Sequence, residues 1–148
     1  MATRRSNLRV FLDTNVIFSG LYSSHGAPGS ILECFTRGTV SVVISQMVLD
    51  ESVRIVKEKL PEGLGSLRRL LRSAPIEIQI DPPVDEIRKW SDKVPFVDAI
   101  ILAAAINAKV DYFITGDSHF FTSSNIRDAS GLKIVTPSQF ISIIKNNG

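Results

Sequence analysis

The chain reads Val10-Phe11-Leu12-Asp13-Thr14-Asn15-Val16-Ile17-Phe18 near one end, an apolar run interrupted by three polar residues. An ionised carboxylate in apolar surroundings is costly unless it is paired or holds a metal ion. We therefore expect Asp13 at the end of a strand, facing a site. A second interpretation is that Asp13 only caps the following helix. From this stretch alone, both interpretations are open.

The length and composition indicate an ordinary globular protein. The chain has 148 residues, of which 44% are hydrophobic and 22% are charged, and its mean hydropathy is +0.15. These values are typical of one compact domain, expected to span residues 1–148, rather than of a disordered chain. The net charge of +2 and the pI of about 8.9 permit a nucleic-acid partner without arguing strongly for one.

The cysteine and the apolar runs bear on the compartment. The single cysteine, Cys34, cannot form an intrachain disulfide, which fits a reducing environment, and we expect it to be a small buried hydrophobic residue. The longest fully apolar run, residues 99–106, is far shorter than a membrane span. We therefore expect a soluble, cytoplasmic protein.

Strand patterns alternate with helix patterns along the whole chain. Gly38 is expected to end the second helix, Ser45 to cap the third and Pro75 to end the fourth. This alternation predicts βαβ crossovers and a three-layer α/β/α sandwich around a parallel sheet. The expected strands are residues 8–12, 40–44, 76–80 (at a sheet edge), 112–115 and 133–136, and the expected helices are 16–21, 28–37, 46–59, 62–72, 84–90, 97–108 (the most buried) and 138–145.

Acidic residues are predicted to meet at one edge of this sheet. Asp13 and Asp117 follow the first and fourth strands, and ligands bind in open parallel sheets at the carboxyl ends of the strands. Asp98 lies in the first turn of the helix that leads into the fourth strand, so it begins at the same edge. Each also has a structural interpretation: Asp98 as a helix-terminal anion and Asp117 as a turn residue.

Glu51 is the fourth acidic candidate. It lies in the helix after the second strand, on one stripe with Met47 and Ile55, and a carboxylate in an apolar row needs a partner. Its neighbour Asp50 is expected to pair with Arg54 on another face. Glu51 can also be a rim carboxylate that reaches water.

Crowded carboxylates repel one another unless a cation neutralises them. Because no His or Cys set has zinc spacing, one or two Mg²⁺ or Mn²⁺ ions fit this cluster best. Such ions support hydrolysis of a phosphodiester. Asn15 and Thr115, beside two of the acids, are expected to orient a carboxylate or a bound water.

The chain resembles a PIN domain, and most closely the small single-domain prokaryotic PIN proteins described as toxin components. The resemblance rests on stretches in the same order over nearly the whole chain: residues 10–16, 45–51, 97–99 with the alanine-rich helix, Thr115-Gly116-Asp117, and 135–140. It implies a five-stranded parallel sheet and a Mg²⁺- or Mn²⁺-dependent ribonuclease whose catalytic, metal-binding acids fall on Asp13, Glu51, Asp98 and Asp117. It also implies a type II toxin–antitoxin pair with a small antitoxin, and a homodimer.

One feature departs from the family pattern. Phe96 and Val97 precede Asp98 where relatives often carry a further acid, so no auxiliary metal ligand is expected there. A PIN-like module that is catalytically inactive and only binds RNA or a partner is the main alternative, and the four acids argue against it. A receiver-like signalling domain fits less well, because the acid after the third strand, Asp81, lies in a proline-rich turn.

Other polar residues have structural as well as functional interpretations. His119 is expected to pack beside its phenylalanine neighbours, although it can also contact a phosphate. His25 is expected in an exposed loop. Arg68, Arg69 and Arg72 form a basic helix face that can bind RNA phosphates, or can simply be solvated.

Overall fold

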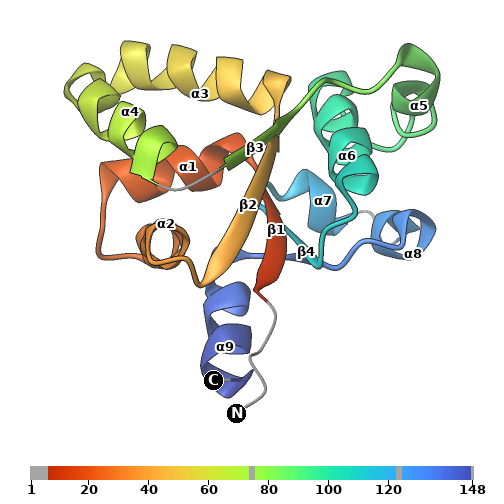
Figure 1. The fold of residues 1–148 in the computed structure, drawn as a ribbon. Helices are drawn as coiled ribbons and strands as arrows, with labels where there is room; N and C mark the ends of the chain where they lie inside the picture. The colour runs from red at the N-terminus through yellow and green to blue at the C-terminus, as the bar shows by residue number, and fades with distance from the viewer. Residues whose placement is uncertain (1–6, 74–75, 123–124, 148) are drawn as a thin grey trace.

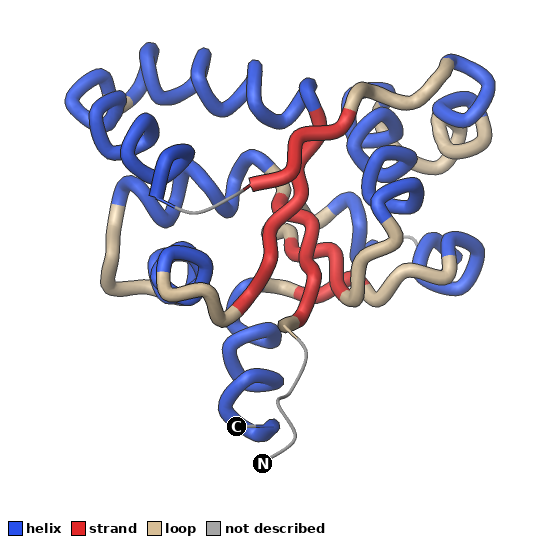
Figure 2. Tube along the Cα trace, in the orientation of Figure 1, coloured by secondary structure: helices blue, strands red, loops and turns tan. Residues whose placement is uncertain are grey.

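A single parallel sheet organises the structure, a computed structural model that describes residues 7–73, 76–122 and 125–147. The five strands lie in the order β3-β2-β1-β4-β5, and every pair is parallel (Figure 2). This arrangement confirms the expected α/β class and places the third strand at an edge. The strands are β1 (Leu8–Leu12), β2 (Val40–Ser45), β3 (Ile76–Gln79), β4 (Tyr112–Ile114) and β5 (Ile134–Val135).

The strand order reverses beside β1. The chain first adds β2 and β3 on one side of β1, and then crosses over to place β4 on the other side, with Leu12 paired to Ile114. Ligands bind at such a reversal, because the connections on the two sides leave in opposite directions and open a crevice. The crevice here lies where β1 and β4 end, so it is bordered by Asp13 and Thr115.

Helices cover both faces of the sheet. Figure 1 shows the sheet nearly edge-on, with α1 to α4 to its left, α5 to α8 to its right and α9 below. The helices are α1 (Thr14–Tyr22), α2 (Ala27–Thr36), α3 (Gln46–Lys59), α4 (Leu64–Ser73), α5 (Val84–Arg88), α6 (Phe96–Ala108), α7 (His119–Thr122), α8 (Asn125–Ser130) and α9 (Pro137–Asn147), with a short 3₁₀ helix at Pro61–Gly63.

The expected helix ends have clear local causes. The Ser45 hydroxyl accepts a hydrogen bond from the Val48 backbone N–H (3.2 Å) and caps α3 as expected. Gly38 has a φ of +79° just after α2, a conformation that favours glycine. The fourth helix starts two residues later than expected, because Pro61–Gly63 forms a separate 3₁₀ turn. Pro75 lies outside the described residues.

Two glycines allow α1 and α2 to pack closely. A Cβ on Gly20 would lie 2.5 Å from Leu32 Cδ1, and one on Gly29 would lie 2.7 Å from backbone atoms of Ser24. A side chain at either position would therefore push α1, α2 or their connecting loop apart. This close approach fixes α1, the helix that follows Asp13.

The core on both sides of the sheet is apolar. The α6 helix is buried along most of its length, as expected, and Phe113 packs edge-on against Phe11 and Phe120 with ring centroids 5.7 and 5.1 Å away. Cys34 is only half-buried, which corrects the expectation of a buried residue, because it packs against the margin of the core rather than within it. Within the described ranges, no helix has the length and apolar character needed to cross a bilayer.

Sequence patterns did not predict α7 and α8. These helices have only four and six residues, too few to show a helical repeat of apolar side chains. The buried Phe120 anchors α7 against Phe113 of β4. This anchor fixes the turn at residues 116–119, immediately after β4.

Candidate functional site

Asp13 both caps α1 and faces the crevice, so the two interpretations of this residue hold together. Its Oδ1 accepts a hydrogen bond from the Thr14 backbone N–H (2.8 Å), which makes Asp13 the N-cap of α1. Its Oδ2 accepts hydrogen bonds from Thr115 Oγ1 (2.7 Å) and Asn15 Nδ2 (3.2 Å). The residue is only 4% exposed. Thr115, directly after β4, and Asn15, in the first turn of α1, thus orient the Asp13 carboxylate from two different segments.

Burial and hydrogen bonding shift the pKa of Asp13 in opposite directions. The pKa of this carboxyl is raised to about 6, chiefly by burial and also by the nearby charges of Asp117 and Asp98, while the hydrogen bonds from Thr115 and Thr14 partly oppose the rise. A cation stabilises a carboxylate that is shielded from water and faces other carboxylates. A positively charged ligand at this point would therefore stabilise the ionised form of Asp13.

Glu51 reaches the same crevice from α3. Its Oε1 accepts a hydrogen bond from Thr14 Oγ1 (2.6 Å), so one residue of α1, Thr14, donates to Asp13 through its backbone and to Glu51 through its side chain. The expected pairing of Asp50 with Arg54 is wrong. Asp50 instead accepts from Gln46 Nε2 (2.9 Å), whereas Arg54 lies 3.4 Å from Glu58 and 3.9 Å from Glu51, because these partners also lie one helical turn away.

Asp98 and Asp117 meet around His119. The His119 Nδ1 atom lies 2.8 Å from Asp98 Oδ2 and 3.1 Å from Asp117 Oδ1. The Asp98 side chain does not cap its helix, since the N-cap of α6 is Pro95. Asp117 does act as a turn residue, because its Oδ1 accepts from the His119 backbone N–H (2.9 Å). It nevertheless contributes its carboxylate to the cluster.

The carboxyls and the imidazole shift one another's titration. Burial and the adjacent Asp117 raise the pKa of Asp98, which the hydrogen bond from His119 partly opposes. The hydrogen bond to Asp98 and the charge of Asp117 raise the pKa of His119. When protonated, the imidazole is a positive partner of these two acids.

His119 corrects a sequence-based expectation. It does not pack beside its phenylalanine neighbours: its side chain is 55% exposed and its ring contacts the acids, while Phe120 turns into the core instead. The available signal was the spacing of Asp117 and His119 within one turn, which brings the two side chains together. His25 is exposed, as expected.

One pocket of about 290 Å³ collects these groups. The donor set fits a hard divalent cation, because the oxygens come from several carboxylates and Lys59 is the one lysine or arginine among the described lining residues. Asp98, Asp117 and His119 also offer ligand atoms within 4.8 Å of one another. The pocket is lined by Asp13, Thr14, Asn15, Phe18, Glu51, Ile55, Lys59, Val97, Asp98 and Asp117.

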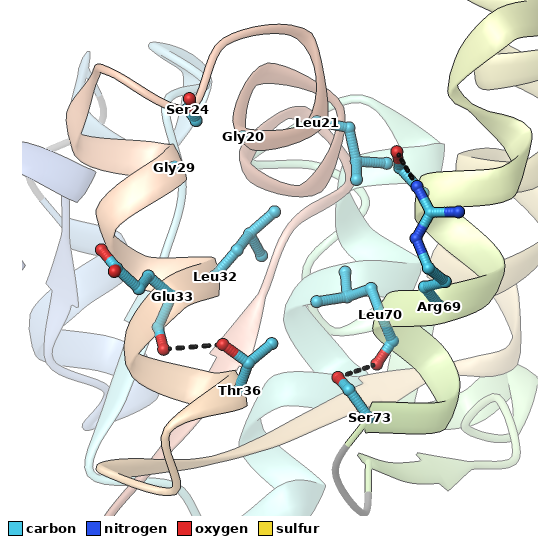
Figure 3. A pocket seen from close by; sticks show the side chains of 11 residues that line it. Gly20, Leu21, Ser24, Gly29, Leu32, Glu33, Thr36, Arg69, Leu70 and Ser73 are labelled. Carbon is cyan, nitrogen blue, oxygen red and sulfur yellow. Dashed lines mark hydrogen bonds between the residues drawn. The ribbon is translucent and has the colours of Figure 1, made fainter.

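The basic face of α4 lies apart from this pocket. Arg69 lines a second pocket, of about 520 Å³, between α1, α2 and α4, and Figure 3 shows its guanidinium hydrogen-bonded at one side of that pocket. The bond runs to Ser66 Oγ (3.1 Å). Arg68 and Arg72 are exposed on α4. None of these three arginines lines the acidic pocket.

The family follows from a match that covers most of the chain and all of the acidic residues of the site. A model of the PIN domain matches residues 9–119, a segment that contains all four acids and His119. The chain belongs to the PIN domain family. As a PIN domain, it is 26% identical to the uncharacterized protein MJ1680 of Methanocaldococcus jannaschii, over 90% of each chain.

Solved structures share the fold of this PIN domain. The structure of VapBC2 from Rickettsia felis, bound to a DNA fragment from its promoter, has a TM-score of 0.64 at 18% identity, covering 87% of this chain and 98% of that one. FitAcB from Neisseria gonorrhoeae gives 0.60 at 19%, covering 86% and 97%. A toxin–antitoxin complex from Klebsiella pneumoniae gives 0.59 at 22%, with the same coverage.

Proposed function

We propose that this PIN domain is a metal-dependent endoribonuclease that hydrolyses phosphodiester bonds of single-stranded RNA in the cytoplasm. The observation that carries the proposal is the shared pocket of Asp13, Glu51, Asp98 and Asp117, four carboxylates from four separate segments. These residues would hold one or two Mg²⁺ or Mn²⁺ ions. Such an ion, when bound, supplies a Lewis acid for the phosphate and an activated water.

The chain's own residues prepare the pocket for this role. Thr115 and Thr14 donate hydrogen bonds that favour the ionised form of Asp13, and Thr14 also orients Glu51. Asn15 donates to Asp13 and accepts from the Gly116 backbone N–H (2.9 Å), so it ties the end of β1 to the end of β4. The exposed His119, when protonated, can donate a hydrogen bond to a phosphate oxygen at the rim. Arg68, Arg69 and Arg72 are proposed as a more distant contact for the phosphates of a longer RNA.

The direct test is cleavage of a labelled RNA by the purified protein with Mn²⁺ or Mg²⁺. We expect cleavage by the natural protein and a loss of at least about a hundredfold for Glu51→Gln or Asp13→Asn, since each removes a proposed ligand. Asp50→Asn is the matched control, because Asp50 neighbours Glu51 on α3 but bonds to Gln46 outside the pocket. Cleavage that survives both substitutions contradicts the proposal.

The inactive module remains the alternative, and the same experiment separates it. A module that only binds RNA or a partner retains RNA binding, shows no cleavage above the Asp13→Asn background, and needs no divalent cation. The raised pKa of Asp13 supports the enzyme proposal. A buried carboxylate that faces other carboxylates lowers the stability of the fold unless a cation compensates it, and an inactive module needs no cation.

We also propose that the ribonuclease is the toxin of a toxin–antitoxin pair, with a small antitoxin protein as partner and a homodimer as assembly. The support is fold similarity to VapBC2, FitAcB and the Klebsiella complex. Induced expression should arrest growth, and co-expression of a neighbouring small open reading frame should relieve the arrest. Unchanged growth on induction counts against the toxin role, and sedimentation tests the dimer.

A further inference from the structure

The acidic pocket continues into a groove between α1 and α3. Phe18 of α1 lines it on one side, and Ile55 and Lys59 of α3 line it on the other. Glu51, Ile55 and Lys59 are spaced at i, i+4 and i+8, so they form one stripe along α3. Lys59 therefore lies two helical turns, about 12 Å, beyond Glu51. The groove therefore has a positively charged ammonium, that of Lys59, beyond the carboxylates.

An aromatic surface extends from the same groove. Phe18 stacks on Tyr22, with ring centroids 6.1 Å apart and an interplanar angle of 18°. Tyr22 lies one turn after Phe18 on the same face of α1, and it is 70% exposed. Phe18 lines the acidic pocket, and the exposed ring of Tyr22 extends this aromatic surface one turn further along α1.

We propose that Phe18, Tyr22 and Lys59 bind the part of a single-stranded RNA next to the bond that is cut. A nucleobase stacks on the Tyr22–Phe18 pair, and a neighbouring phosphate contacts the Lys59 ammonium. Stacking on aromatic side chains and contact of the backbone with cations are the two interactions that bind single strands without reading sequence. This inference rests on the proposed ribonuclease function.

The arrangement selects a single strand over a duplex. In a duplex the faces of each base are already covered by its neighbours, so a base must be unstacked before it can lie on Tyr22. A single strand offers its bases without that cost. The aromatic surface thus supplies a physical reason for the preference included in the proposed function.

Binding can be measured without cleavage. We would follow the fluorescence anisotropy of a labelled ten-nucleotide single-stranded RNA with the natural protein in EDTA. Tyr22→Ala should weaken binding about tenfold, the effect of losing one base stack. Tyr22→Phe, which keeps the ring, should remain within about twofold. Ile80→Ala is the control. Ile80 is also an exposed apolar residue, at 90%, but it follows the edge strand β3 and does not line the acidic pocket.

The cation has its own readout. Lys59→Gln should lower the salt dependence of binding by about 0.7 in the slope of log K against log salt, as expected for one phosphate contact on a single strand. Lys57→Gln is the matched control, since Lys57 also lies in the last turn of α3 but does not line the acidic pocket. Its slope should stay unchanged.

Several results would overturn the inference. These are unchanged binding by Tyr22→Ala, equal weakening by Tyr22→Phe, equal affinity for a blunt duplex, or no binding of RNA by the natural protein. The ribonuclease proposal fails separately. Binding that depends on Tyr22 without any cleavage in Mn²⁺ contradicts the enzyme alone, whereas cleavage that is indifferent to Tyr22 contradicts the groove alone.

Discussion

The Thr115 hydroxyl donates a hydrogen bond to Asp13 Oδ2 (Oγ1 to Oδ2 distance 2.7 Å). This bond spans the point where the strand order of the sheet reverses. The same hydroxyl oxygen accepts the Asp117 backbone N–H at 3.0 Å. A single side chain therefore fixes the carboxylate that ends β1 and the turn that carries the acid after β4. Thr115 is fully buried, so its hydroxyl makes these bonds shielded from solvent.

Thr115→Val should weaken binding of Mn²⁺ by about tenfold to a hundredfold, the usual effect of removing a group that orients a metal ligand. The pKa of Asp13 should rise above about 6, because a donor to the ionised form is lost. Titration calorimetry measures the affinity, and carbon NMR of the carboxyl measures the pKa. Thr115→Ser keeps the hydroxyl and should behave like the natural protein. Equal losses in both variants would contradict this role.

Stability without divalent cations should fall as pH rises from about 4 to about 6. Asp13 ionises in the unfolded chain near its usual pKa of 3.8, but in the fold only near 6, so the folded state holds the extra proton over this window. The loss attributable to Asp13 is about 3 kcal/mol. Urea unfolding in EDTA at several pH values measures it.

The control for this pH dependence is Asp13→Asn, which has no proton to exchange. Its stability should change less over the same window, and excess Mg²⁺ should stabilise the natural protein at pH 7.5 but not this variant. A pH slope that is the same in both proteins would show that Asp13 is not responsible.

His119 should report directly on the acids around it. Its pKa is raised by the hydrogen bond to Asp98 and by the charge of Asp117, so Asp117→Asn should lower it. Added Mg²⁺ should also lower it, because the cation competes for the same carboxylates. Proton NMR of the ring follows both changes, and His25→Gln identifies the signal, since the chain has two histidines. Asp111→Asn, far from the pocket, serves as the comparison.

Gly29→Ala should destabilise the fold by about 1–3 kcal/mol, because its Cβ would lie 2.7 Å from Ser24 backbone atoms that no rotamer change can move. Gly65→Ala should instead stabilise it by up to about 1 kcal/mol, since that Cβ meets only the end of Arg69 at 3.6 Å and α4 loses a flexible residue. Urea denaturation compares the two. Similar effects of both substitutions would argue against the close packing of α1 and α2.

The sequence predicted the sheet well, because its strands are short runs containing β-branched or aromatic residues that end at turn or helix-cap signals. It also placed Asp13 and Asp117 at one edge, since this follows from parallel topology alone. It did not show that Thr115 bonds to Asp13, which depends on the pairing of Leu12 with Ile114. The sequence of a single strand does not determine which of its residues pair with a strand that is distant in the chain.

The surroundings of His119 and Asp50 show a different limit. Whether His119 packs or contacts the acids depends on which neighbour enters the core, and the burial of Phe120 decides this. The pairing of Asp50 depends on competition among side chains that are equally spaced on α3. Local spacing defines the possible partners, while tertiary packing selects among them. The catalytic roles of the acids stay predictions.

The hydrogen bond from Thr115 to Asp13 joins residues 102 positions apart. During synthesis, a chain that has not yet emerged from the ribosome past residue 117 contains β1 and α3 but lacks the acid after β4. Asp13 then has neither its strongest donor nor its complete set of neighbours. The pocket can therefore be completed only after the chain has been made through Asp117, long after β1 has formed its end of the crevice.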